Sequence, residues 1–113
     1  LLGKAGDDRL TGNKGADILK GGRDNDILKG NGGDNTLHGG KGRDTFVVGE
    51  GNDLVKDFNI KKDFIQVPDS NYTIIADGKD SKISFDGTGE AEKNITTVLD
   101  IDASILGSLI QIN

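Results

Sequence analysis

The sequence predicts an all-β protein, in which a roll of about three stacked coils is followed by a β-strand cap. Three observations predict this fold: a nine-residue phrase that recurs six times, glycine concentrated in the first half, and strand patterns in the second half. The chain has 113 residues, 33% of them hydrophobic, and no cysteine. Because neither a large apolar core nor disulfides can stabilise it, a bound metal is the additional stabilising element that we expect.

The repeat follows the pattern Gly-Gly-x-Gly-x-Asp-x-U-x, in which U is a large apolar residue. Its six units start at Gly3, Gly12, Gly21, Gly30, Gly39 and Val48. In each unit the first six positions favour a glycine-rich turn, and the last three favour a short strand with one inward residue. One unit therefore makes half a coil, and stacked coils place two small parallel sheets face to face. The inward residues form two walls: Leu10, Leu28 and Phe46 on one side, and Leu19, Leu37 and Val55 on the other.

The composition changes at residue 57, which divides the chain into a repeat region, 1–56, and a cap, 57–113. Fourteen of the 18 glycines lie before this boundary. In the cap we expect a strand at 62–67 ended by Pro68, a hairpin of 72–76 with 82–85, a strand at 95–101, and a strand or short helix at 105–112. These strands would cover the open end of the stack, whose apolar face and strand edges need protection.

The turns of the repeat have the composition of a site for a hard cation. Calcium takes about six to eight oxygens, which carboxylates and backbone carbonyls can supply together. The sixth positions are Asp8, Asp17, Asp26, Asn35, Asp44 and Asp53. Units two apart stack on the same side, so one cation would lie between each pair: Asp8 with Asp26, Asp17 with Asn35, Asp26 with Asp44, and Asn35 with Asp53. This spacing allows up to four Ca²⁺ ions, and the two sites that share Asn35 should bind more weakly because they lack one formal charge.

Six units in register resemble the RTX (repeats-in-toxin) family of calcium-binding nonapeptide-repeat proteins, and residues 95–102 and 104–106 resemble the end region of exported RTX proteins. The resemblance implies a parallel β-roll with calcium between successive loops. It implies carbonyl ligands from the second and fourth loop positions: Lys4, Gly6, Asn13, Gly15, Gly22, Asp24, Asn31, Gly33, Gly40, Gly42, Gly49 and Gly51. Asp57 matches an acid that closes the last site. The resemblance also implies export through type I secretion machinery that recognises a signal within 57–113.

These observations predict a calcium-binding module, not an enzyme, of a larger secreted or cell-surface protein that folds on Ca²⁺ outside the cell. One alternative is a carbohydrate-binding module of the kind attached to alginate-modifying enzymes. It would be favoured by a groove of outward basic residues: Lys20, Lys29, Lys56, Arg23, Lys41 and Arg43. The other alternative is the terminal segment of a surface adhesin. The net charge of −5 argues against a nucleic-acid partner. No apolar run is long enough to be a transmembrane segment. With His38 as the single histidine and no cysteine, a zinc site is excluded.

Overall fold

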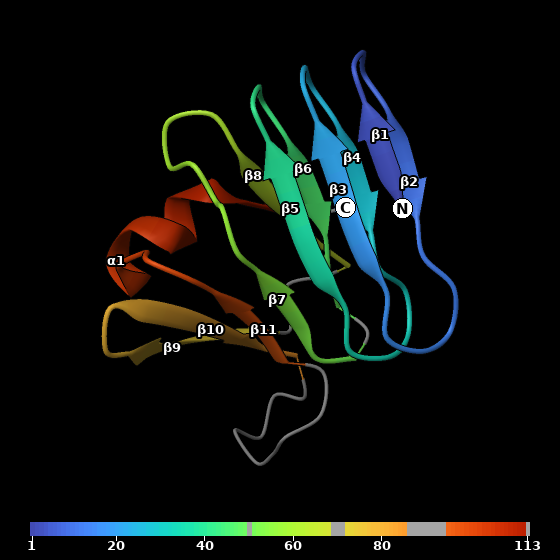
Figure 1. The fold of residues 1–113 in the computed structure, drawn as a ribbon. Helices are drawn as coiled ribbons and strands as arrows, with labels where there is room; N and C mark the ends of the chain where they lie inside the picture. Colours follow the sequence, from blue (N-terminus) through green and yellow to red (C-terminus); the bar gives the residue numbers. More distant parts are fainter. Residues whose placement is uncertain (50, 69–71, 86–94, 113) are drawn as a thin grey trace.

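The structure, a computed structural model, describes residues 1–49, 51–68, 72–85 and 95–112 (Figure 1). Two β-sheets face each other and enclose the core, and a short helix lies at the end opposite the N-terminus. The predicted all-β fold class, a parallel β-roll with a cap that is mainly β structure, is confirmed.

The repeat units form short strands that alternate between the two sheets. The larger sheet contains β1 (Leu2–Lys4), β3 (Ile18–Gly22), β5 (Thr36–Gly40) and β7 (Asp53–Val55). The smaller sheet contains β2 (Arg9–Thr11), β4 (Ile27–Lys29), β6 (Thr45–Val47) and β8 (Phe64–Val67). Neighbouring strands in each set run parallel. The six units supply β2 to β7, the strands of the three predicted coils. With β1 before them and β8 after them, the roll has about four coils.

The register of the sheets follows the period of the sequence. Leu10 is paired with Leu28 and Leu28 with Phe46, each 18 residues further along the chain. In the opposite sheet Leu19, Leu37 and Val55 are paired in the same way, so both predicted walls are confirmed. The last step of the smaller sheet pairs β6 with β8 one residue out of this period, because the connecting segment 57–63 is longer by one residue.

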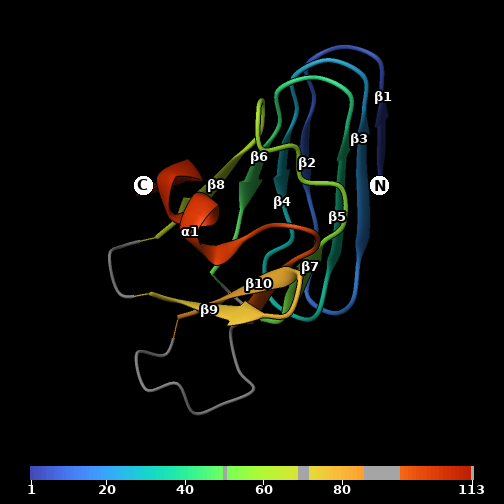
Figure 2. The ribbon, with the colours of Figure 1, turned by 90° about the vertical axis from the view of Figure 1, so that its left-hand side faces the viewer.

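The cap extends both sheets of the roll. It contains β9 (Thr73–Asp77), β10 (Asp80–Ser84), β11 (Ile95–Val98), α1 (Ala103–Leu106), the 3-10 turn η1 (Gly107–Leu109) and β12 (Ile110–Ile112). The predicted hairpin is confirmed as the antiparallel pair β9–β10. β11 lies between β7 and β10, and β12 pairs in parallel with β8, so the sheet orders are β1-β3-β5-β7-β11-β10-β9 and β12-β8-β6-β4-β2 (Figures 1 and 2). Residues 105–112 therefore contain the end of a helix and a strand.

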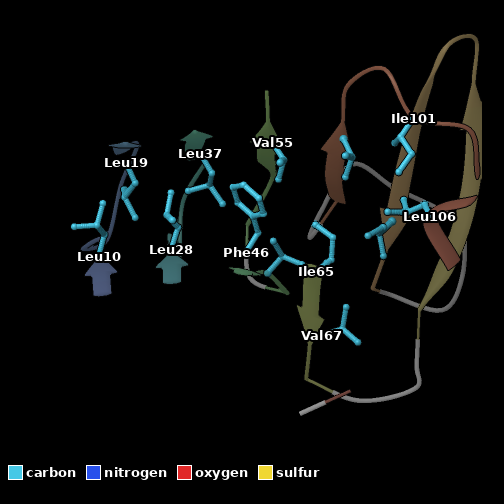
Figure 3. Packing of buried hydrophobic residues seen from close by; sticks show 13 residues of the cluster. Leu10, Leu19, Leu28, Leu37, Phe46, Val55, Ile65, Val67, Ile101 and Leu106 are labelled. Carbon is cyan, nitrogen blue, oxygen red and sulfur yellow. The ribbon is translucent and has the colours of Figure 1, made fainter. Parts of the chain in front are cut away.

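The core runs without interruption from the roll into the cap (Figure 3). In the roll, Leu19, Leu28, Leu37, Phe46 and Val55 have no exposed surface. The cap continues this row with Ile83, Val98, Ile101 and Leu106. Burying one such side chain contributes about 1.5–3 kcal/mol, so these rows hold the two sheets together.

Candidate metal centre

The turns between the strands stack into two columns at opposite ends of the roll. The first loop column consists of 3–8, 21–26, 39–44 and 57–63, and the second consists of 12–17, 30–35 and 48–53. In Figure 1 the first column lies along the upper ends of the strands and the second along the lower ends. Each column brings together loops 18 or 19 residues apart, as the parallel register requires.

In the first loop column the sixth-position acids form a continuous ladder. The Asp8 N–H donates to Oδ1 of Asp26 at 2.8 Å, and the Asp26 N–H donates to Oδ1 of Asp44 at 2.9 Å. The Asp44 N–H then donates to Oδ1 of Asp63 at 2.9 Å. The structure therefore brings together the predicted pairs Asp8 with Asp26 and Asp26 with Asp44. The bond from Asp44 extends the series by one further acid, Asp63. Asp26, Asp44 and Asp63 are all buried.

The second carboxylate oxygen of these acids identifies where positive charge is needed. Oδ2 of Asp8, Asp26 and Asp44 is buried and accepts no hydrogen bond. A Cβ on Gly3 would lie 2.5 Å from Oδ2 of Asp8 and 2.5 Å from the Gly21 carbonyl oxygen, so the first-position glycine makes room for both oxygens. A buried carboxylate without a partner is strongly unfavourable. A donor set made of oxygens alone fits calcium, which would supply the missing charge.

The carbonyl groups of the second and fourth loop positions are oriented along the columns. Of the twelve residues predicted to offer carbonyl ligands, eleven have positive φ, and Asn13 is the exception. A Cβ on Gly40 would overlap the carbonyl oxygen of Gly22, the equivalent residue of the previous loop. The same holds for the carbonyl oxygens of Lys4, Gly15, Asp24 and Gly33, so these five oxygens point toward the next loop of their column. Those of Lys4 and Gly22 accept the N–H groups of Arg23 and Lys41 there.

Asp24 occupies a fourth position at which the other five units have glycine. It adopts φ 73°, a conformation that aspartate tolerates better than most residues. Its Oδ2 accepts a hydrogen bond from the Gly6 N–H at 2.8 Å. The turn at 21–26 therefore keeps its shape, and the substitution adds a bond between neighbouring loops.

The second loop column brings together the other two predicted pairs. The Asp17 N–H donates to Oδ1 of Asn35 at 2.9 Å, and the Asn35 N–H donates to Oδ1 of Asp53 at 3.3 Å. Asn35 and Asp53 are buried. Among the residues that the structure describes, the only buried side-chain atom without a hydrogen bond outside the first column is Oγ1 of Thr96, in the cap.

Two acids lie at the end of the first column. Asp57, the predicted closing acid, accepts hydrogen bonds from the N–H groups of Gly39 and Gly40, both at 2.8 Å. The stacked position above Asp44 belongs to Asp63, which the repeat pattern does not single out as a ligand. The signal in the sequence is that Asp63 starts an acid-x-apolar triplet like the end of five of the six units. It nevertheless follows Asp44 by 19 residues and lacks a glycine-rich turn.

Side chains alone do not make a complete cation site here. Within the described ranges no group of three or more Asp, Glu, His or Cys side chains is placed to hold one metal ion. Each gap of the first column offers paired acids, and the remaining ligands would be backbone carbonyls of the two loops. Cation binding therefore depends on the loop conformation, which links it to folding.

The pH dependence of the calcium-free protein tests the charge state of this column. Burial raises the pKa of Asp44 to about 6, although the hydrogen bond from the Asp26 N–H lowers this pKa. Burial also raises the pKa of Asp26 and of Asp63. Because these values exceed those of the unfolded chain, the calcium-free fold is most stable below the ordinary pKa of 3.8 and loses stability as the pH rises through about 6. We expect a larger folded fraction at about pH 5 than at about pH 7.

Circular dichroism of protein freed from calcium on a chelating resin measures this fraction. Calcium affinity should change in the opposite direction and fall at about pH 5, since the same carboxylates must lose protons to bind the ion. A calcium-free protein that is better folded at neutral pH would contradict the assigned burial of these acids.

The residues that form most of both loop columns match a known family. The model of the family described as RTX calcium-binding nonapeptide repeat (4 copies) matches residues 1–28 and 20–55. No curated protein matches the chain. Among solved structures, the chain is similar to the AlgE6R3 subunit from the Azotobacter vinelandii mannuronan C5-epimerase, determined in solution. That similarity has 23% sequence identity and a TM-score of 0.43, and it covers 93% of this chain and 77% of that chain.

Proposed function

Because residues 1–55 of this chain belong to the RTX calcium-binding nonapeptide repeat family, we propose that the chain is a calcium-dependent folding module of a larger exported protein. The observation that carries this proposal is the set of three buried carboxylate oxygens without donors, on Asp8, Asp26 and Asp44. All three lie in one column between stacked loops. Bound calcium supplies the positive charge that would balance them.

The chain's own residues explain why folding would wait for calcium. The acids of the first column are brought close by the register of the sheets, and their mutual repulsion opposes folding. The apolar rows between the two sheets favour folding. They are small, because only 33% of the residues are hydrophobic. A site that exists only in the folded state adds its binding free energy to folding. The roll should therefore be disordered where calcium is scarce and folded at about millimolar calcium, the range of extracellular modules.

A calcium titration followed by circular dichroism tests the proposal. We expect a disordered spectrum in excess chelator and a cooperative gain of β signal as calcium reaches about the millimolar range. Magnesium is the matched control, because it demands near-octahedral geometry at shorter distances and should not substitute. A full β spectrum in excess chelator would rule out calcium-dependent folding.

The location and the export route are further parts of the proposal. We assign residues 1–56 to the calcium roll and 57–113 to a cap that contains a type I secretion signal, and we place the module outside the cell with a non-enzymatic role. This assignment is supported by the sequence of residues 95–102 and 104–106, which resembles the end region of exported RTX proteins. In the part of the chain that the structure describes, no helix is long and apolar enough to cross a membrane. A reporter fused to 57–113 and produced with a type I exporter should reach the medium if the signal lies there.

Binding of an anionic polysaccharide is the second candidate function. One observation favours it: Lys20 and His38 are paired neighbours on the outer face of the larger sheet, and Lys56 follows at the end of β7. Lys20 and Lys56 are exposed, so this basic row can contact a carboxylated chain. A gel shift with an anionic polysaccharide discriminates this function from a purely structural one.

A further inference from the structure

Asn35 turns a nitrogen atom toward its own loop, where the aspartates at the other sixth positions turn an oxygen atom. Its Oδ1 accepts the Asp17 N–H at 2.9 Å, the same bond that Oδ1 of Asp26 and Asp44 makes with the preceding loop. Since only the carbonyl oxygen of an amide can accept this bond, the other atom of the Asn35 amide must be the nitrogen. The orientation of the amide is therefore determined by its neighbour.

The nitrogen of Asn35 takes the place of the unpartnered carboxylate oxygen of the first column. A Cβ on Gly30 would meet Nδ2 of Asn35, just as a Cβ on Gly21 or Gly39 would meet Oδ2 of the aspartate in its own loop. In the first column that atom is an acceptor without a donor. In the second column it is a donor, so the same place carries the opposite hydrogen-bonding character.

Oxygen atoms converge on this nitrogen as they would on a cation. Nδ2 of Asn35 lies 3.0 Å from Oδ1 of Asp53 in the next loop. It also lies 3.2 Å from the carbonyl oxygen of Asn31, 3.4 Å from that of Gly33 and 3.5 Å from that of Gly32. The partners are a sixth-position carboxylate and loop carbonyls, which are the ligand types expected for calcium. The amide group has two N–H donors for these four oxygens, and it is buried among them.

The other gap of the second column contains a second amide. Nδ2 of Asn31, at a second loop position, donates to the carbonyl oxygen of Gly12 in the preceding loop at 2.9 Å. Oδ2 of Asp17, the acid of that preceding loop, accepts the Asn13 N–H at 2.8 Å. At the second positions of the first column stand Lys4, Gly22 and Gly40, which have no side-chain amide.

We propose that the two columns are held in different ways: the amides of Asn31 and Asn35 replace calcium in the second column, and calcium binds only in the first. This inference rests on the proposed calcium-dependent function and assigns its sites. The first column has three gaps, each next to one unpartnered oxygen of Asp8, Asp26 or Asp44. The chain therefore binds at most three calcium ions, although sequence spacing allows four sites, and the second column needs none.

Counting bound calcium in the wild-type chain and in two opposite variants tests the inference. Asn35→Asp restores the repeat consensus in the second column, and we expect it to raise the count by one ion per chain. Asp26→Asn places an amide in the first column, and we expect it to lower the count by at least one. Isothermal titration calorimetry and equilibrium dialysis give the counts.

The outcomes separate this inference from the proposed function. A wild-type count of one to three ions that rises in Asn35→Asp supports the inference. A wild-type count of four or more overturns it even if neither variant folds, and so does a count that Asn35→Asp leaves unchanged. A wild-type chain that binds no calcium refutes the proposed function, and the inference with it.

Discussion

Replacing Asp44 by alanine is expected to abolish most of the calcium-dependent stability of the roll. Asp44 has no exposed surface and lies between Asp26 and Asp63, so it lines two gaps of the first column. At a calcium concentration about 100 times the dissociation constant, each bound ion stabilises the fold by about 2.7 kcal/mol. Loss of both gaps therefore removes about 5 kcal/mol, which is comparable to the whole stability of a small domain.

Urea unfolding with and without calcium measures this effect. In saturating calcium the free energy of unfolding should fall steeply, whereas in chelator both the variant and the wild-type chain should be disordered. Asp77→Ala is the matched control, because Asp77 is exposed and makes one salt bridge, to Lys82 at 3.4 Å. An Asp44→Ala protein that retains the full difference between calcium and chelator would show that the first column does not bind the ion.

Replacing Phe46 by alanine is expected to destabilise the roll by about 3–5 kcal/mol, the usual cost of removing a buried aromatic side chain. Phe46 is fully buried in its wall, next to Ile65 of β8 (Figure 3). Its ring packs against that of Phe58 with ring centroids 5.9 Å apart. The cavity would lie where the roll meets the cap, so both parts should lose stability together.

Unfolding of Phe46→Ala in saturating calcium checks this prediction, with Ile18→Ala as the control on an outward strand position. Ile18 is 58% exposed, so its truncation should change the free energy of unfolding by less than about 0.5 kcal/mol. The calcium midpoint should also move to a higher concentration, since binding must then compensate for the weaker core. A loss below about 1 kcal/mol would mean that the apolar rows contribute little to the fold.

Much of the roll could be predicted because its structure is periodic. A residue nine positions along lies on the opposite wall, and one 18 positions along lies directly beside it, so the pairing of Leu10 with Leu28 follows from counting. The same counting brings Asp26 next to Asp44. The cap has no period, and its strands pair across long separations, as β11 does with β7. Local patterns predicted the hairpin and most of the strands there, but they left residues 105–112 open between helix and strand.

By itself, the sequence determined the all-β class, the two walls and the stacking of the sixth positions, because each depends on the period of nine. The same period predicts a hard cation between the loops. Only the tertiary structure decided how the loops are used. It placed Asp63 one residue out of period above Asp44, and it turned the Asn35 amide nitrogen toward the loop carbonyls. The physical reason is that hydrogen-bond direction and the pairing of distant strands depend on neighbours in space. A period along the chain specifies the position of each residue in the stack. It does not specify which atom of a side chain faces which atom of the neighbouring loop.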